Sequence, residues 1–233
     1  MTVFFNTLLF GVYPYIALVV LTLGSIIRYD RDPYTWRAGS SQLLSRRQLV
    51  WGSVLFHVGV LAIFAGHVVG LLTPLWFWEA IGVSHGAKQV IAILLGGVAG
   101  LVGIAGGTLL VHRRLFNARV RANSSFADTM IIIVLWVQLA LGLATIAVSV
   151  QHLDGEEMVK FMLWAQGIFT FNPDAALYVA EASLIFKAHI VLGLTIFVLF
   201  PFTRLVHMLS VPVRYVWRPG YQVVRTSATR QSK

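Results

Sequence analysis

The chain of 233 residues is 58% hydrophobic and only 12% charged, and its formal net charge is +9. Soluble domains carry about 25% charged residues, so this composition excludes an ordinary soluble protein and predicts an integral membrane protein. The chain contains no cysteine. This excludes disulfide bonds, iron–sulfur clusters held by its own thiolates, and haem attached covalently through thioether bonds.

Five apolar stretches are long enough to cross a bilayer, which takes about 20 residues of helix. They cover approximately residues 3–27, 49–72, 89–111, 129–150 and 188–209. We therefore expect an all-α five-helix transmembrane bundle in residues 1–209, followed by a basic cytoplasmic tail in residues 210–233. No basic residue precedes the first stretch and no small-residue cleavage site follows it, so we expect a retained helix.

Basic residues lie almost entirely on one side of this five-span topology. All but three of the 18 Lys and Arg residues lie between spans one and two, between spans three and four, or from Arg204 near the end of span five onward. The exceptions are Lys88, Lys160 and Lys187. The positive-inside rule then predicts an outside N-terminus and a cytoplasmic C-terminus. The positive net charge therefore follows from the membrane topology, with basic side chains placed near anionic lipid at the inner surface. It gives no reason to expect nucleic-acid binding.

Two further segments predict how the bundle is built. The third stretch carries Gly96, Gly100, Gly103 and Gly107 on one helical face, where another helix or a flat ring can approach; we favour helix packing. Between spans four and five, the apolar run MVKFMLWAQGIFTF is too short to cross the membrane. We expect it at the outer interface, either as an anchor or as a lid over a lipid-soluble substrate.

Four of the seven histidines lie inside apolar stretches, where ionisable side chains are costly. His57 and His67 are in the second stretch, and His189 and His207 are in the fifth. Because these two spans run antiparallel, we expect His67 to meet His189 toward the outside and His57 to meet His207 toward the cytoplasm. Two such pairs predict two non-covalently held bis-histidine haems. The alternative is that the histidines form hydrogen bonds between helices.

The spacing of the histidines predicts details of the fifth span. His189 and His207 are 18 residues apart, about five turns of an ideal helix, and would share a face. Pro201 between them is expected to bend the helix. Glycines next to the histidines are expected to make room for porphyrin; they are Gly59, Gly66, Gly70 and Gly193.

One haem near each membrane surface would make the bundle an electron conduit. The residues alone leave three interpretations open: a subunit of a quinol-oxidising complex, the cytochrome b of another quinone-linked reductase, or a transporter or proton channel lined by histidine. Reduced-minus-oxidised absorption spectra would distinguish the haem proteins from the transporter.

Along nearly its whole length the chain resembles the cytochrome b (gamma) subunit of respiratory membrane-bound nitrate reductase. The matching passages are YPYIA, RYDRDPYTWRAGSSQLLSRR, FHVGVLAIFAGHVVGLLTP, RRLFNARVRA, VQLALGLATI, QHLDGEEM and FVLFPFTRLVHMLSVPVRY. The resemblance implies a multi-pass protein of the cell (inner) membrane that oxidises quinol, either menaquinol or ubiquinol. Its electrons would pass to an iron–sulfur beta subunit and then to a molybdenum-containing alpha subunit that reduces nitrate in the cytoplasm.

The resemblance also implies roles for particular residues. His67 and His189 would ligate the outer haem b, and His57 and His207 the inner one. Lys88 and Gly66 match the region of the quinol pocket. Further residues match positions near the inner haem; they are Tyr29, Arg37, Ser40 and Arg114. The basic, aromatic tail RYVWRPGYQVVR is expected to bind the iron–sulfur partner, or else to lie against lipid.

Overall fold

The structure, a computed structural model, describes residues 2–37, 39, 41, 43–210 and 217, and these ranges contain helices and no strand. Ser40 and nearly all of the expected tail lie outside the described residues. Within these described ranges, five helical stretches are long and apolar enough to span a membrane: Val3–Arg31, Arg46–Leu72, His85–Phe116, Phe126–Ser149 and Leu184–Phe202. The expected all-α, five-span architecture is confirmed.

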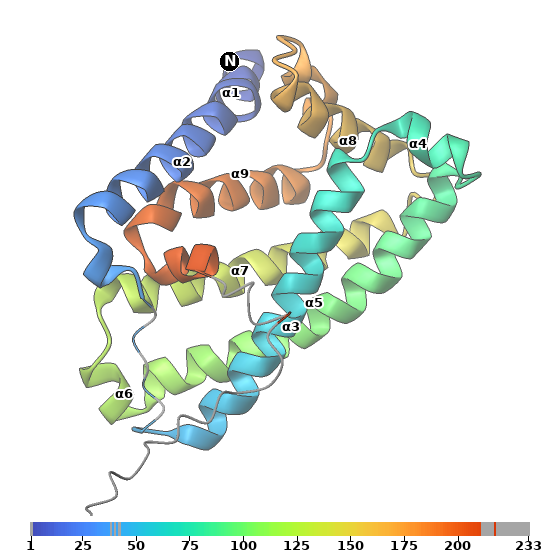
Figure 1. Cartoon of the computed structure of the whole chain (residues 1–233). Coiled ribbons are helices and arrows are strands. Elements are labelled where there is room, and N and C mark those ends of the chain that lie inside the picture. Colours follow the sequence, from blue (N-terminus) through green and yellow to red (C-terminus); the bar gives the residue numbers. More distant parts are fainter. Residues whose placement is uncertain (1, 38, 40, 42, 211–216, 218–233) are drawn as a thin grey trace, which may run out of the picture.

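The spanning helices form a row in which each helix packs on the next. The first span comprises α1 (Thr2–Thr7), the π-helical η1 (Leu8–Val12) and α2 (Tyr13–Arg31). The others are built on α3 (Arg46–Leu72), α5 (His85–Phe116), α7 (Phe126–Ser149) and α9 (Leu184–Leu199). The order of neighbours is α3, α5, α7, α9 and α2 (Figure 1). The sequence neighbours α2 and α3 are therefore at opposite ends of the row.

Short helices cover the two ends of the bundle. The N-terminus, α4 (Leu75–Ala80) and α8 (Glu156–Phe169) lie at one end, and α6 (Ala118–Ala122) lies at the other (Figure 1). We call these the α8 end and the α6 end. α8 packs against α3, α5 and the 3-10 helix η3 (Ala175–Val179). The Trp164 indole donates to the carbonyl of Phe10 at 2.9 Å, so this non-spanning segment is folded onto the bundle.

Glycines bring α3 and α5 into backbone contact. A Cβ on Gly59 would lie 2.7 Å from the carbonyl oxygen of Ala99, and one on Gly106 would lie 2.8 Å from that of Gly52. Such distances are shorter than real carbon–oxygen contacts, so only glycine fits. Gly59 therefore serves helix packing, and the expectation that it makes room for a porphyrin was wrong.

The fifth span is broken and does not continue as one helix to residue 209. α9 ends at Leu199 and is followed by two 3-10 helices, η4 (Phe200–Phe202) and η5 (Arg204–Ser210), separated by the extended Thr203. Pro201 lacks an N–H and clashes with the preceding turn. His207 therefore lies in η5, and the expectation that it shares one five-turn helical face with His189 was wrong.

Arg28 compensates for this break. Its Nη1 donates to the carbonyls of Pro201 at 2.7 Å and Thr203 at 2.8 Å, and its Nη2 donates to the carbonyl of Thr35 at 2.9 Å in η2 (Pro33–Thr35). Carbonyls freed from helical hydrogen bonds are costly in a membrane unless another group satisfies them. Arg28 thus links the end of the first span to the broken end of the fifth.

Gly106→Ala should destabilise the protein by about 1–3 kcal/mol, the usual cost of overpacking, because the new Cβ has no space at the α3 backbone. Gly97→Ala on the same helix is the control, since its Cβ would lie 3.9 Å from the nearest atom, Ile146 Cδ1. Thermal unfolding in detergent, followed by tryptophan fluorescence, measures both. An unchanged midpoint for Gly106→Ala would show that the helices are not in backbone contact.

Candidate functional site

The structure brings the four membrane histidines together as two pairs. The rings of His57 (α3) and His207 (η5) have centroids 6.2 Å apart, with 72° between their planes. The rings of His67 (α3) and His189 (α9) have centroids 6.2 Å apart, with 37° between their planes. The first pair lies toward the α6 end of α3 and the second toward its α8 end.

Three of the four rings are oriented in the same way. In each, Nδ1 lies at a backbone carbonyl about one turn earlier: His57 at Ser53 (2.7 Å), His67 at Ile63 (2.8 Å) and His207 at Arg204 (2.5 Å). A carbonyl only accepts, so Nδ1 must carry the proton and Nε2 keeps its lone pair. This is the arrangement by which proteins orient histidines that ligate metals.

His189 is held differently. Its Nδ1 is buried and has no hydrogen-bond partner among the described residues, and the same is true of Gln138 Oε1. The Gln138 amide donates to the His189 carbonyl at 3.1 Å and lies 3.5 Å from its Nε2. Gly142 on α7 supplies the space beside this ring, because a Cβ there would lie 3.1 Å from His189 Cε1.

The surroundings of the pairs fit a haem in each. α3 packs on α5 and not along α9, and both α3 histidines are exposed. A Cβ on Gly66 or Gly70 would meet nothing within 4 Å, so there is open space beside His67. Metal–imidazole bonds are about 2 Å long, and ring centroids 6.2 Å apart leave room for one ion between two nitrogens. Within the described residues no three acidic or histidine side chains form a metal cluster.

Lys88 is buried at the α8 end, with 6% of its surface exposed. Its Nζ donates to the carbonyl of Gly70 at 2.8 Å and to Met162 Sδ at 2.7 Å, and it lies 4.6 Å from the centre of the Trp78 ring. The sequence analysis missed Trp78 and Met162, although both lie in apolar runs that are too short to span. Gly66 lies on α3 one turn before Gly70, whose carbonyl accepts the hydrogen bond from Lys88.

The described residues that were expected near the inner haem make different local contacts. Arg114 is 9% exposed, and its Nη1 donates to Ser124 Oγ at 2.9 Å. Tyr29 is exposed and packs edge-on against Trp36 at 5.4 Å between ring centroids. Arg37 is exposed, and its backbone N–H donates to the carbonyl of Thr35 at 2.8 Å.

Asp128, which the sequence analysis missed, joins the polar groups at the α6 end. Its Oδ1 lies 2.8 Å from Arg204 Nε, and its Oδ2 lies 3.8 Å from Arg114 Nη1. Asp128 lies in the first turn of α7. Acidic residues are common at helix N-termini, so its position in the sequence did not indicate that it pairs with distant arginines.

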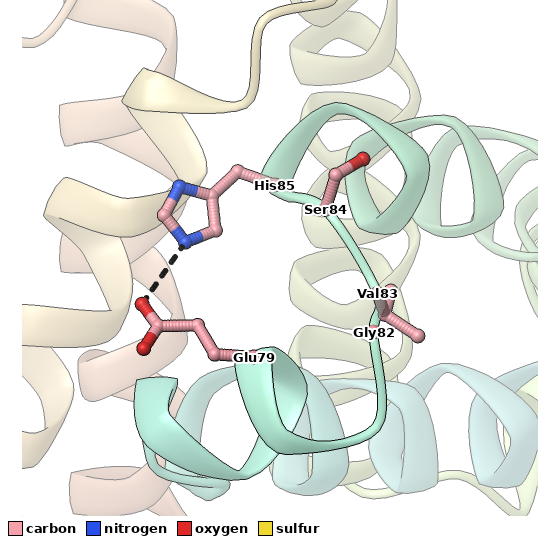
Figure 2. Close-up of a pocket in the computed structure, with 5 residues that line it drawn as sticks. All are labelled: Glu79, Gly82, Val83, Ser84 and His85. Atoms are coloured by element: carbon pink, nitrogen blue, oxygen red, sulfur yellow. Dashed lines mark ion pairs between the residues drawn. The ribbon is translucent and has the colours of Figure 1, made fainter.

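A pocket at the α8 end is lined by Glu79, Gly82, Val83, Ser84 and His85. Figure 2 shows the imidazole of His85 facing the carboxylate of Glu79, with Nε2 and Oε1 4.0 Å apart. Both side chains are exposed. His85 lies one helical turn before Lys88 on α5.

Comparison with known proteins places the chain in a family. The model of the nitrate reductase gamma subunit family matches residues 6–227. The chain is 49% identical to respiratory nitrate reductase 1 gamma chain of Escherichia coli (strain K12), over 95% of this chain and 98% of that protein. It is 48% identical to respiratory nitrate reductase 2 gamma chain of the same strain, over 96% and 98%. It is 38% identical to the nitrate reductase gamma chain of Bacillus subtilis (strain 168), over 94% and 97%. These matches span almost the full length of both chains, and the chain therefore belongs to the nitrate reductase gamma subunit family.

Proposed function

We propose that the chain is the cytochrome b subunit that carries electrons from quinol, through two haems b, toward the catalytic subunits of a nitrate reductase. The observation that supports this most strongly is the pair of facing imidazoles at each end of the bundle, with Nε2 free on three of the four rings. A bound haem supplies reversible one-electron chemistry, which no amino-acid side chain of this chain provides.

The protein's own contribution is to hold the two sites at different depths. His67 and His189 would ligate the haem at the α8 end, and His57 and His207 the haem at the α6 end. The positive-inside rule makes the α8 end the outer one, because Arg113 and Arg114 end α5 at the α6 end. The protein would thus lie in the cell (inner) membrane with its basic end facing the cytoplasm.

The partners follow from what this chain lacks. Nitrate reduction needs a metal centre, and a chain without cysteine cannot hold an iron–sulfur relay by thiolates. The relatives are named as gamma chains of nitrate reductases, which supports an iron–sulfur beta subunit and a molybdenum-containing alpha subunit as partners. Arg37, Ser40, Tyr29 and Arg114 would act around the inner haem, where arginine binds carboxylates such as propionates.

Quinol would be oxidised at the α8 end beside Lys88. The buried ammonium already donates to one carbonyl and one sulfur, so it can exchange one of these weak partners for a quinol oxygen. Met162 and Trp78 cover the ammonium and would exclude water from it. α8 would therefore have to move for quinol to enter, which favours a lid over a simple anchor.

The separation of the two sites has an energetic consequence. Moving one electron inward against a membrane potential costs about 2.3 kcal/mol per 100 mV. Protons released from quinol on the outer side would store this work as a gradient. The exposed Glu79–His85 pair lies at the same end and would accept such protons.

Replacing one histidine should remove one haem. His67→Ala and His57→Ala should each retain one b-type haem per chain instead of two, because a bis-histidine site loses an axial ligand. His152→Ala is the control, since His152 is exposed in the loop after α7. The pyridine haemochrome assay on purified, folded protein gives the count. Two haems in either α3 variant would contradict the ligand assignment.

Lys88→Ala should slow reduction of both haems by quinol roughly 10- to 100-fold, the effect of losing a hydrogen bond from a charged group. Spectra of the dithionite-reduced haems should be unchanged. Lys160→Ala is the matched control, because Lys160 is at the same end but its ammonium pairs with Glu157 at 3.3 Å. Stopped-flow absorption measures both variants, and normal quinol-driven reduction in Lys88→Ala would exclude this pocket.

A further inference from the structure

His207 is the one paired histidine that is not carried by a long helix. It lies in the seven-residue 3-10 helix η5, after the break at Pro201 and Thr203. His57 and His67 are inside the 27-residue α3, which fixes their direction. A 3-10 helix has poorer hydrogen-bond geometry than an α-helix, so the orientation of His207 depends on tertiary contacts.

Arg204, the first residue of η5, contacts His207 within the helix and also contacts other parts of the chain. Its backbone carbonyl accepts the hydrogen bond from His207 Nδ1 at 2.5 Å. Its guanidinium lies 2.8 Å from Asp128 Oδ1 through Nε and donates to the carbonyl of Gly39 at 3.0 Å through Nη2. The residue that orients the imidazole is thus anchored by its side chain to α7 and to the loop after α2.

Asp128 also connects this anchor to α5. Its second oxygen lies 3.8 Å from Arg114 Nη1. The three side chains are 23%, 25% and 11% exposed for Asp128, Arg204 and Arg114, so solvent screens them only partly. One carboxylate between two guanidiniums connects the end of α5 and the start of η5 to the start of α7.

We propose that Asp128 is a positioning residue for His207: through Arg204 it fixes the direction of the imidazole and balances the positive charge beside the inner haem. This inference rests on the proposed role of His207 as an axial ligand. Asp128 does not contact His207. Its carboxylate contacts the side chain of Arg204, and the backbone carbonyl of Arg204 orients the His207 imidazole.

The charge balance gives the sign of the effect. Without the carboxylate, two guanidiniums near the inner site are no longer compensated, and the local potential becomes more positive. A haem carries one positive charge less when it is reduced, so a more positive surrounding favours the reduced form. Loss of the Asp128 charge should therefore raise the midpoint potential of the inner haem and leave that of the outer haem unchanged.

The test is a redox titration of both haems in membranes containing the full complex, with Asp128→Asn, Asp128→Glu and Glu157→Gln compared with the unaltered chain. Asn keeps the shape and an acceptor oxygen but removes the charge. Glu157→Gln is the control, because it removes a carboxylate of similar exposure that pairs with Lys160 on α8. The inner haem is identified as the one missing from His207→Ala.

For Asp128→Asn we expect an upward shift of the inner midpoint potential and altered g values of the inner ferric haem in electron paramagnetic resonance. Asp128→Glu should restore both, and Glu157→Gln should not move the inner haem. Selective loss of the inner haem in Asp128→Asn, rescued by Asp128→Glu, supports the same role. An unshifted inner haem, equal shifts of both haems, or a loss that Glu does not rescue would overturn it. A wild-type protein without two haems would instead contradict the proposed function.

Discussion

An imidazole ring inside hydrocarbon needs a partner for its polar nitrogens, because no water is there to supply one. Three of the four membrane histidines satisfy Nδ1 with a carbonyl of their own helix. Nε2 then keeps its lone pair, and the ring centroids within each pair are 6.2 Å apart. Each histidine pair therefore offers unprotonated ring nitrogens that could ligate a metal, and there is open space beside His67 at Gly66 and Gly70.

The helix packing supplies this room. Gly59 and Gly106 allow α3 to pack closely on α5. The histidines of α3 lie on the side of that helix that faces His189 of α9 and His207 of η5. In the fifth span, Pro201 ends α9 before His207 is reached, and Arg28 satisfies the carbonyls released there. The break separates the two histidines of that span, so each can be oriented independently.

The sequence predicted the features that depend on local composition. Runs of apolar residues identified the five spans, and the depth of each histidine within its span identified the pairs that the structure brings together. The boundaries differ where a single residue overrides the apolar pattern. The fifth span was expected to reach residue 209, but it ends at Phe202 because Pro201 stops the helix. Ligation of haem and the orientation of the termini stay predictions.

Other features could not be predicted because they depend on which distant segments meet. Trp78 of α4 and Met162 of α8 both contact Lys88. The sequences of these two short helices do not indicate that they pack against Lys88. Asp128 pairs with Arg204, 76 residues later in the chain, and nothing in its own neighbourhood indicates this. Gly106 was outside the expected glycine stripe, yet a Cβ there would lie 2.8 Å from the Gly52 carbonyl oxygen of α3, whereas one on Gly103 would lie 3.7 Å from Gly59 Cα.

We propose that each histidine pair holds one haem through both of its imidazoles. Near-infrared magnetic circular dichroism of the oxidised protein tests this directly, because the charge-transfer band of low-spin ferric haem reports its two axial ligands. We expect the whole haem content, two per chain, to show the bis-imidazole band. A band of histidine–methionine ligation, a high-spin fraction equal to half of the haem, or a single haem per chain would contradict it.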